Sequence, residues 1–281
     1  MAALVAAGGF GTTTLRTDTS LEVVWADATT PMRAFTKTAD FYAGDCDDVP
    51  FPVPAGAAIE GETGLACTQN GDCHLLVIAP HLGKLYEMWR ANITGAAQSQ
   101  FRAGCTAVWD LTRAYGPTLR GKGCSSADAA GFPITAMLAN ADEVKAGAVN
   151  HALRFTLPNP EIRDGIYTPP ATHSTGPTAG GPNMPPYGVR LRLKASFNEN
   201  LVTSTGGKVL VRALKKYGMF LADGGNIPLT LQSDRFTKAK WADVGITNSQ
   251  ALAAITANDF EVVQLGTLTN WKSDTTCYRN P

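Results

Sequence analysis

The chain has 281 residues, a length that can bury a substantial core in one large domain or two smaller ones. Its 24 cations balance its 24 anions, which excludes the overall basic charge typical of nucleic-acid-binding proteins. Charged residues are sparse at 17%, while Gly (28) and Pro (17) are plentiful, so the composition indicates a compact protein with many turns rather than a helical bundle or a disordered chain.

The N-terminal part, residues 1–50, is expected to be an extended segment. It begins with a short apolar run, MAALVAAGG, which lacks a basic lead-in and is far too short to cross a bilayer. Prolines that alternate with apolar residues at 50–54 block a regular helix. Since no other stretch reaches the length of a transmembrane helix, we expect a soluble protein without a membrane span.

Strand-like runs dominate the rest of the chain. Short apolar or β-branched runs bounded by Gly, Pro or Asn predict strands at 74–80, 84–93, 106–112, 150–158, 189–197, 219–223 and 260–265. Helical spacing of apolar residues predicts an amphipathic helix at 207–218 and a second helix at 249–257. A segment with six prolines, 168–186, is expected to be a long functional loop or a packed irregular excursion. Because strands and helices do not alternate regularly, the predicted fold class is mainly β: a single β-sandwich or barrel-like domain, residues 1–281, with two or three attached helices.

The six cysteines indicate disulfide bonds. Two of them, Cys67 and Cys73, flank an Asn-Gly turn that would bring them close together. No CxxC pair occurs, and no histidine follows a cysteine pair at zinc-finger spacing, so a structural zinc site is disfavoured. Three bridges are possible, and the sequence leaves their pairing open. With the glycosylation sequon that begins at Asn92, they predict a secreted, extracellular protein.

Three cations stand at every second position of the segment YGVRLRLKASF. Arg190, Arg192 and Lys194 would therefore share one face of a strand. That face is either a solvated outer surface or the floor of a groove that binds carboxylate or sulfate groups of an acidic polysaccharide.

Four segments carry a resemblance to a known family: CSSADAAGFPI (124–134), HALRFTLP (151–158), YGVRLRLKASF (187–197) and ALKKYGMFLADGG (213–225). Together they resemble the motifs SADAAG-x-P, HALRFT, YGxRLRLKASF and ALKKYGM-x-x-AD of an uncharacterised family of secreted bacterial and eukaryotic-microbial proteins, some of them joined to carbohydrate-binding modules. The resemblance runs from about Pro52 to Phe260 and implies an extracellular protein that works near polysaccharide. Gly224 stands where the family has Asn, and the CTQNGDC insertion is unusual, so specificity carried by loops would differ here.

Two carboxylates on mostly apolar strand faces, Glu87 and Asp110, form the candidate catalytic pair. Apolar surroundings raise the pKa of a carboxyl group, which prepares a general acid for work near neutral pH. On neighbouring strands the two groups would serve as the acid and the base or nucleophile of glycoside hydrolysis. The alternative is a structural role, with each group in solvent or paired with a nearby Arg. Asp128 is a third candidate carboxylate, and Trp89 and Trp109 are candidate platforms for sugar rings.

The histidines supply further candidates. His74 and His151 begin apolar strands and are candidate catalytic bases, while His173, in the Pro-rich loop, is a candidate substrate-binding residue. The spacing of the histidines matches no metal motif, and the sequence has no Walker loop and no Gly-x-Gly-x-x-Gly. We therefore expect neither a metal site nor a nucleotide cofactor.

These features favour a secreted, carbohydrate-active enzyme that cleaves a polysaccharide, a glycoside hydrolase that uses a carboxylate pair. One alternative is a polysaccharide lyase, in which the cationic strand would stabilise the enolate-like transition state and His151, His173 or Tyr187 would accept the proton. The other is a non-catalytic protein that binds a cell-wall or matrix glycan, or that has an extracellular structural role. The expected partner is a glycan and not a nucleic acid, and the oligomeric state is left open.

Overall fold

A computed structural model describes residues 1–40, 44–263 and 265–280. Within these residues the fold is mainly β, as predicted, and two sheets account for most of it. The six-stranded sheet has the order β1 (Thr17–Leu21), β16 (Leu229–Gln232), β12 (Leu153–Leu157), β15 (Met219–Gly224), β14 (Arg190–Leu193), β17 (Phe260–Val262). The four-stranded sheet has the order β10 (Thr106–Asp110), β7 (Lys84–Met88), β6 (Leu75–Ala79), β2 (Val23–Trp25).

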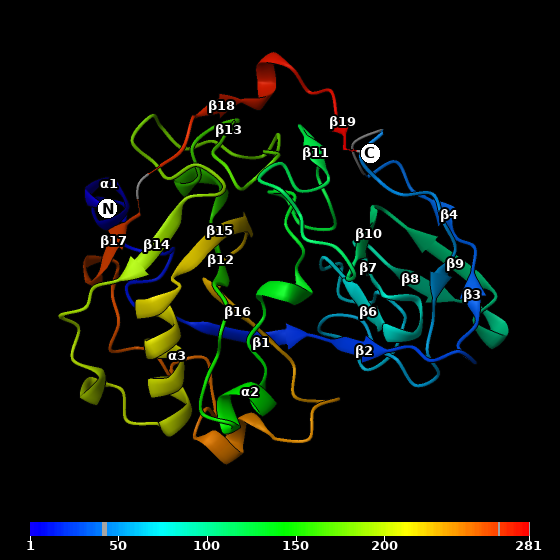
Figure 1. The fold of residues 1–281 in the computed structure, drawn as a ribbon, viewed down its shortest axis with the longest axis horizontal. Helices are drawn as coiled ribbons and strands as arrows, with labels where there is room; N and C mark the ends of the chain where they lie inside the picture. The colour runs from blue at the N-terminus through cyan, green and yellow to red at the C-terminus, as the bar shows by residue number, and fades with distance from the viewer. Residues whose placement is uncertain (41–43, 264, 281) are drawn as a thin grey trace.

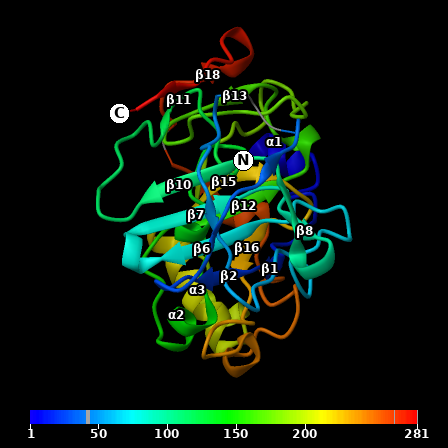
Figure 2. The ribbon, with the colours of Figure 1, turned by 90° about the vertical axis from the view of Figure 1, so that its right-hand side faces the viewer.

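The two sheets lie side by side and are joined by one continuous run of chain. Only Glu22 separates β1 from β2, and Figure 1 shows this run crossing from one sheet to the other. In Figure 2 the four-stranded sheet stands in front of the six-stranded one. No sheet closes into a barrel among the described residues, so the barrel-like alternative does not apply.

Smaller elements complete the described part of the chain. The short strands are β3 (Met32–Arg33) with β5 (Phe51–Pro52), β4 (Thr36–Lys37) with β9 (Gln100–Ala103) and β8 (Asn92–Thr94), β11 (Gly121–Lys122) with β19 (Tyr278–Arg279), and β13 (Ile166–Tyr167) with β18 (Thr269–Asn270). The α-helices are α1 (Ala2–Ala6), α2 (Ala141–Lys145) and α3 (Thr205–Lys216). Single 3₁₀ turns lie at Pro80–Leu82, Ala96–Gln98, Thr135–Met137, Asn159–Glu161, Glu199–Leu201, Trp241–Val244, Ala257–Asp259 and Trp271–Ser273.

The six-stranded sheet is mixed, and its parallel pairs matter for the site. β12 runs parallel to β15, and β1 runs parallel to β16, whereas β14 is antiparallel to both of its neighbours. Between β12 and β15 the chain passes through β14 and α3. Because β12 and β15 are parallel neighbours, their carboxyl ends lie next to each other. A ligand site in such sheets commonly lies outside the carboxyl ends of the strands.

Helix α3 confirms the amphipathic helix predicted at 207–218. The Ser204 side chain accepts a hydrogen bond from Gly207 N and caps its start. Its apolar face shares one core with the strand residues Leu153 and Phe155. Gly218 ends the helix at a φ of +74°, and a Cβ at this position would lie 2.4 Å from Leu191 O, so only glycine fits.

Two local predictions were wrong. Residues 249–257 form turns instead of a second helix, since the Asp259 carboxylate accepts hydrogen bonds from Thr256 N and Oγ1 and starts a separate 3₁₀ turn there. A nine-residue helix is also marginal without strong packing. Residues 1–50 are not uniformly extended, because they begin with α1, and Phe10 anchors this end by edge-to-face packing on Phe155 and Phe260.

All the predicted strands exist. Most are shorter than predicted, β15 is one residue longer, and residue 264 of the last run lies outside the described residues. The Pro-rich segment 168–186 is irregular, as predicted, with an isolated bridge at Gly180 and another at Tyr187, just after the segment. Among the described residues, no helix has the length and apolar character needed to cross a membrane.

Candidate functional site

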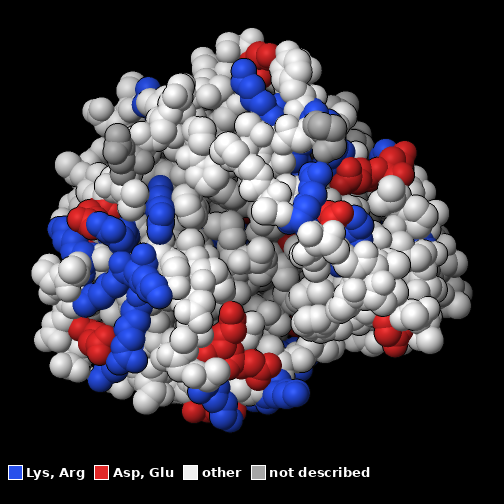
Figure 3. All heavy atoms as spheres, in the orientation of Figure 1, with Lys and Arg blue, Asp and Glu red and all other residues white. Residues whose placement is uncertain are grey.

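A cavity of about 490 Å³ opens where the carboxyl ends of β12 and β15 meet the loops of the four-stranded sheet. In Figure 3 the surface is hollowed near its centre, between the two sheets. The cavity is lined by Ala39, Asp40, Asp72, Trp89, Cys105, residues 125–129, Asn159, Thr175, Pro177, Tyr187, Asp223 and Gly224. Its volume is typical of a site for a small molecule or for one or two sugar rings.

Asp223 reaches the cavity because it lies at the carboxyl end of β15. The register with β12 shifts between Phe155 and Thr156, and this irregularity pairs Thr156 with Asp223 and Leu157 with Gly224. The Asp223 side chain is 22% exposed. Asn159 follows β12 directly and lines the same cavity.

The guanidinium of Arg154, a residue of β12, forms ion pairs with two carboxylates. Its Nη2 atom is 2.6 Å from Asp128 Oδ1 and 3.7 Å from Asp223 Oδ2, and its Nη1 donates to Thr230 Oγ1 at 2.8 Å. The side chains of Arg154 and Asp128 are 3% and 0% exposed. Such a pair is costly to bury and costlier to break, because removal of one partner leaves the other charge without compensation.

The two aspartates next to Arg154 are set for different roles. Burial, followed by repulsion from Asp128 and Asp72, raises the pKa of Asp223 to about 7, although Arg154 and His74 act against the rise. Burial also raises the pKa of Asp128, but the closer contact with Arg154 opposes it. Asp223 can therefore exchange a proton near neutral pH, whereas Asp128 balances the charge of Arg154.

A second buried ion pair supports the cavity wall. His74 Nδ1 lies 2.7 Å from Glu60 Oε2, and the Nε2–H group of the His74 ring donates to Ala127 O at 3.0 Å. Burial disfavours the charged imidazole, but the attraction of Glu60 outweighs this and raises the pKa of His74 to about 9. His74 is thus a cation that orients Ala127, next to Asp128, rather than a free base.

Asp72 is one of two exposed carboxylates that line the cavity, the other being Asp40. It lies in the turn between Cys67 and Cys73, and its Oδ1 accepts a 3.0 Å hydrogen bond from Trp89 Nε1. Trp89 is half-buried and lines the cavity beside it. The cavity lining therefore has a carboxylate and an indole side by side.

Three disulfides converge on the cavity. The bonds are Cys46–Cys105, Cys67–Cys73 and Cys124–Cys277, which confirms the pair predicted from the Asn-Gly turn. Cys105 lines the cavity, Cys73 follows Asp72, and Cys124 precedes Ser125. The loops that form the cavity are therefore covalently fixed, which favours a preorganised site.

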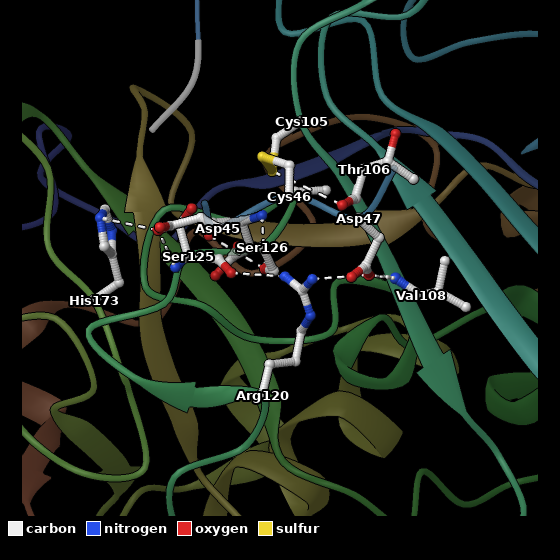
Figure 4. The surroundings of a disulfide bond; sticks show 12 residues. Asp45, Cys46, Asp47, Cys105, Thr106, Val108, Arg120, Ser125, Ser126 and His173 are labelled. Atoms are coloured by element: carbon white, nitrogen blue, oxygen red, sulfur yellow. Dashed lines mark hydrogen bonds and ion pairs between the residues drawn. A yellow bond between two sulfur atoms is a disulfide. The ribbon is translucent and has the colours of Figure 1, made fainter. Parts of the chain in front are cut away.

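Figure 4 shows how the Cys46–Cys105 bond is tied to the cavity wall. Asp45 Oδ2 accepts a hydrogen bond from Ser125 N at 2.7 Å, and Asp47 Oδ2 lies 2.8 Å from Arg120 Nη2. Arg120 Nη1 in turn donates to Ser125 O at 2.8 Å. Asp45 thus holds the N–H group of Ser125 directly, and Asp47 holds its carbonyl group through Arg120.

The predicted pair Glu87 and Asp110 lies outside the cavity lining. Glu87 is 0% exposed and accepts hydrogen bonds from Trp109 Nε1 and from the backbone N–H groups of Ile134 and Thr135. Burial raises its pKa, as expected for a carboxyl group in apolar surroundings. Asp110 pairs with Lys84 at 2.7 Å, and its hydrogen bonds hold its pKa well below the usual range. These contacts are those of structural groups.

The predicted histidines are dispersed. His151 lies 3.5 Å from Glu143, while His173 is fully buried, with Nε2 3.9 Å from Asp45, and burial lowers its pKa to about 4. Among the described residues, the potential metal ligands that lie within 4.8 Å of one another are Glu62, Cys67 and Cys73. Both cysteines form a disulfide, so this group is not a metal site.

The three cations of the predicted strand, Arg190 and Arg192 in β14 and Lys194 just after it, are each engaged outside the cavity. Arg190 Nε donates to Tyr217 O at 2.6 Å, Arg192 pairs with Glu261 at 2.7 Å, and Lys194 Nζ donates to Asn258 O at 2.6 Å. In Figure 3 many Lys and Arg side chains gather on the side of α3, away from the central hollow. These contacts favour the solvated-face interpretation of the cationic strand.

Of the residues predicted from the sequence, Asp128, Trp89 and Tyr187 line the cavity and His74 supports its wall. Sequence reasoning missed Asp72, Arg154 and Asp223. Two signals were present: an arginine inside the apolar run HALRFTLP, and an aspartate at the end of MFLAD. Their meaning depends on the parallel pairing of β12 with β15, which no local pattern indicates.

Comparison with known proteins adds no relative: no protein-family model, no curated protein and no solved structure matches this chain.

Proposed function

We propose that this chain is an extracellular enzyme that hydrolyses glycosidic bonds of a polysaccharide. The observation that carries the proposal is Asp223, a carboxyl group in a 490 Å³ cavity whose pKa of about 7 suits a general acid near neutral pH. Buried ion pairs and three disulfides hold the surrounding loops in place, as a site for chemistry requires.

In the proposed reaction Asp223 gives its proton to the glycosidic oxygen as the bond to the anomeric carbon breaks. Asp72, an exposed carboxylate of the cavity, accepts a proton from the water that adds to that carbon. The half-buried Trp89 offers an indole on which a sugar ring packs. Arg154 is a positioning residue, because it acts on Asp223 and does not line the cavity, whereas Asp128 lines the cavity and balances the charge of Arg154.

The compartment supports a substrate outside the cell. Three disulfides form and persist in oxidising environments, where structural and storage polysaccharides are the abundant polymers. Tyr187 lines the cavity, but the three predicted cations do not and His173 is buried, so the lyase alternative has less support.

A non-catalytic glycan-binding protein is the second candidate. The observation in its favour is Trp25, which is 61% exposed at the edge of the four-stranded sheet, where an indole can bind a sugar ring without any chemistry.

One assay separates these functions. Purified protein is incubated with neutral, amine-bearing and acidic polysaccharides, and new reducing ends are measured together with the absorbance of unsaturated uronates. The hydrolase predicts reducing ends without unsaturation, lost in Asp223→Asn and kept in Asp164→Asn, a matched change in an exposed ion pair with Lys272. Unsaturated products would indicate the lyase, and binding without products would indicate the glycan-binding protein.

A further inference from the structure

The charges that line the cavity have one sign. Four aspartates line it, Asp40, Asp72, Asp128 and Asp223, and no Lys, Arg or His is among its described lining residues. The cations next to the lining residues stand outside the lining: Arg154 pairs with Asp128 at 2.6 Å, His74 with Glu60 at 2.7 Å and Arg120 with Asp47 at 2.8 Å, and Arg90 lies 5.1 Å from the centre of the Trp89 ring.

Two of these carboxylates face the ligand space uncompensated. Asp40 and Asp72 are exposed, and neither forms an ion pair in the part of the chain that the structure describes. Asp72 also lies at the edge of the Trp89 indole. Carboxylates attract an ammonium group through charge-assisted hydrogen bonds.

A third acceptor lies deeper in the cavity wall. The Oδ2 atom of Asp128 is buried and accepts no hydrogen bond within the described residues, while Oδ1 binds Arg154. An unsatisfied buried acceptor is costly, and an N–H or O–H group of a bound ligand would satisfy it.

From this arrangement we infer that the sugar unit held in the cavity carries a free amine, so that the substrate is a cationic polymer of glucosamine type and not a uronate polymer. The inference rests on the proposed function and narrows its substrate class. The carboxylates of a uronate chain would face Asp40 and Asp72 without a lining cation, which is repulsive at close range.

Binding and cleavage are measured separately to test it. Isothermal titration calorimetry uses Asp223→Asn, which does not consume the ligand, with tetrasaccharides of glucosamine, N-acetylglucosamine and galacturonate at slightly acid pH. We expect the glucosamine tetramer to bind at least about tenfold more tightly than the acetylated one at low salt, with the difference reduced at about 0.5 M salt. Asp72→Asn in the same background should remove most of that preference, and Asp164→Asn should not.

Each outcome decides the inference. Equal or tighter binding of the neutral or acidic tetramer overturns it, as does the absence of binding by all three. Cleavage of neutral or acidic polymers alone also overturns it, while the hydrolase proposal stands. A glucosamine preference without cleavage of any polymer supports the ligand class and rejects the hydrolase.

Discussion

The carboxylate of Asp223 lies 3.7 Å from the guanidinium of Arg154, one strand away in the same sheet. That distance is too long for a strong charge-assisted hydrogen bond. The same Nη2 atom lies 2.6 Å from Asp128, which makes the closer contact. The attraction of Arg154 therefore lowers the pKa of Asp223 less than burial and the neighbouring aspartates raise it, and the pKa stays at about 7.

Replacement of Asp223 by Asn should lower kcat by about 10²- to 10⁴-fold, the usual contribution of a general acid. In the unchanged enzyme, kcat should fall as the pH rises through about 7, because Asp223 then loses the proton it must donate. The measurement is a pH profile on the polysaccharide that the panel identifies. Asp164→Asn is the control and should match the unchanged enzyme; an Asp223→Asn variant with an intact profile would contradict the assignment.

Asp223 should also make stability depend on pH. Its pKa is about 7 when folded and 3.8 ordinarily, so between about pH 4 and 7 the folded state holds a proton that the unfolded chain has lost. The free energy of unfolding contributed by this group is therefore largest below pH 4 and declines as the pH rises to 7. Asp223→Asn removes this decline and should be more stable than the unchanged protein at pH 8, by an amount on the order of 2–4 kcal/mol. Urea unfolding at several pH values checks this, and parallel curves for the two proteins would contradict it.

The Arg154–Asp128 pair should be strongly coupled. Arg154→Met leaves a buried carboxylate without its partner and should cost about 3–5 kcal/mol. Asp128→Asn combined with Arg154→Met should cost clearly less than the sum of the single changes, since the double variant leaves no isolated charge. The same cycle on Asp164 and Lys272, a pair nearly half exposed, should give a coupling below about 1 kcal/mol. Comparable couplings for the two pairs would show that Arg154 is solvated in solution.

The disulfides should differ in their contributions to stability and to the site. Cys46–Cys105 closes 59 residues and Cys67–Cys73 only 6, so replacing the first pair by serines should cost about 4 kcal/mol and the second about 2 kcal/mol. The small loop nevertheless carries Asp72. We therefore expect the variant without Cys67–Cys73 to remain folded at 25 °C while ligand binding weakens, as shown by thermal unfolding and calorimetry on one sample. Full binding in that variant would show that Trp89 alone positions Asp72.

The sequence predicts the strand content, the main helix and one disulfide because these follow from local periodicity and a local turn. It identifies Asp128 and Trp89 as candidates from their residue types. It does not identify Asp223, because the functional role of a carboxylate at the end of β15 depends on which strand lies beside β15. The parallel neighbour β12 is more than 60 residues away in the sequence, and Asp72 comes from a loop of the other sheet.

A substitution at Glu87 tests whether the chemistry belongs to the carboxylate pair predicted from the sequence or to the cavity seen in the structure. Its carboxylate accepts three hydrogen bonds in the interior, and Gln offers one acceptor oxygen and an NH₂ group that faces donors. Glu87→Gln should therefore lower the free energy of unfolding by about 3 kcal/mol, as expected for buried donors left unpaired. Its kcat, measured well below its own unfolding temperature, should stay within about twofold of the unchanged enzyme, because Glu87 does not line the cavity. A loss as large as that of Asp223→Asn in a folded Glu87→Gln protein would move the chemistry to the four-stranded sheet.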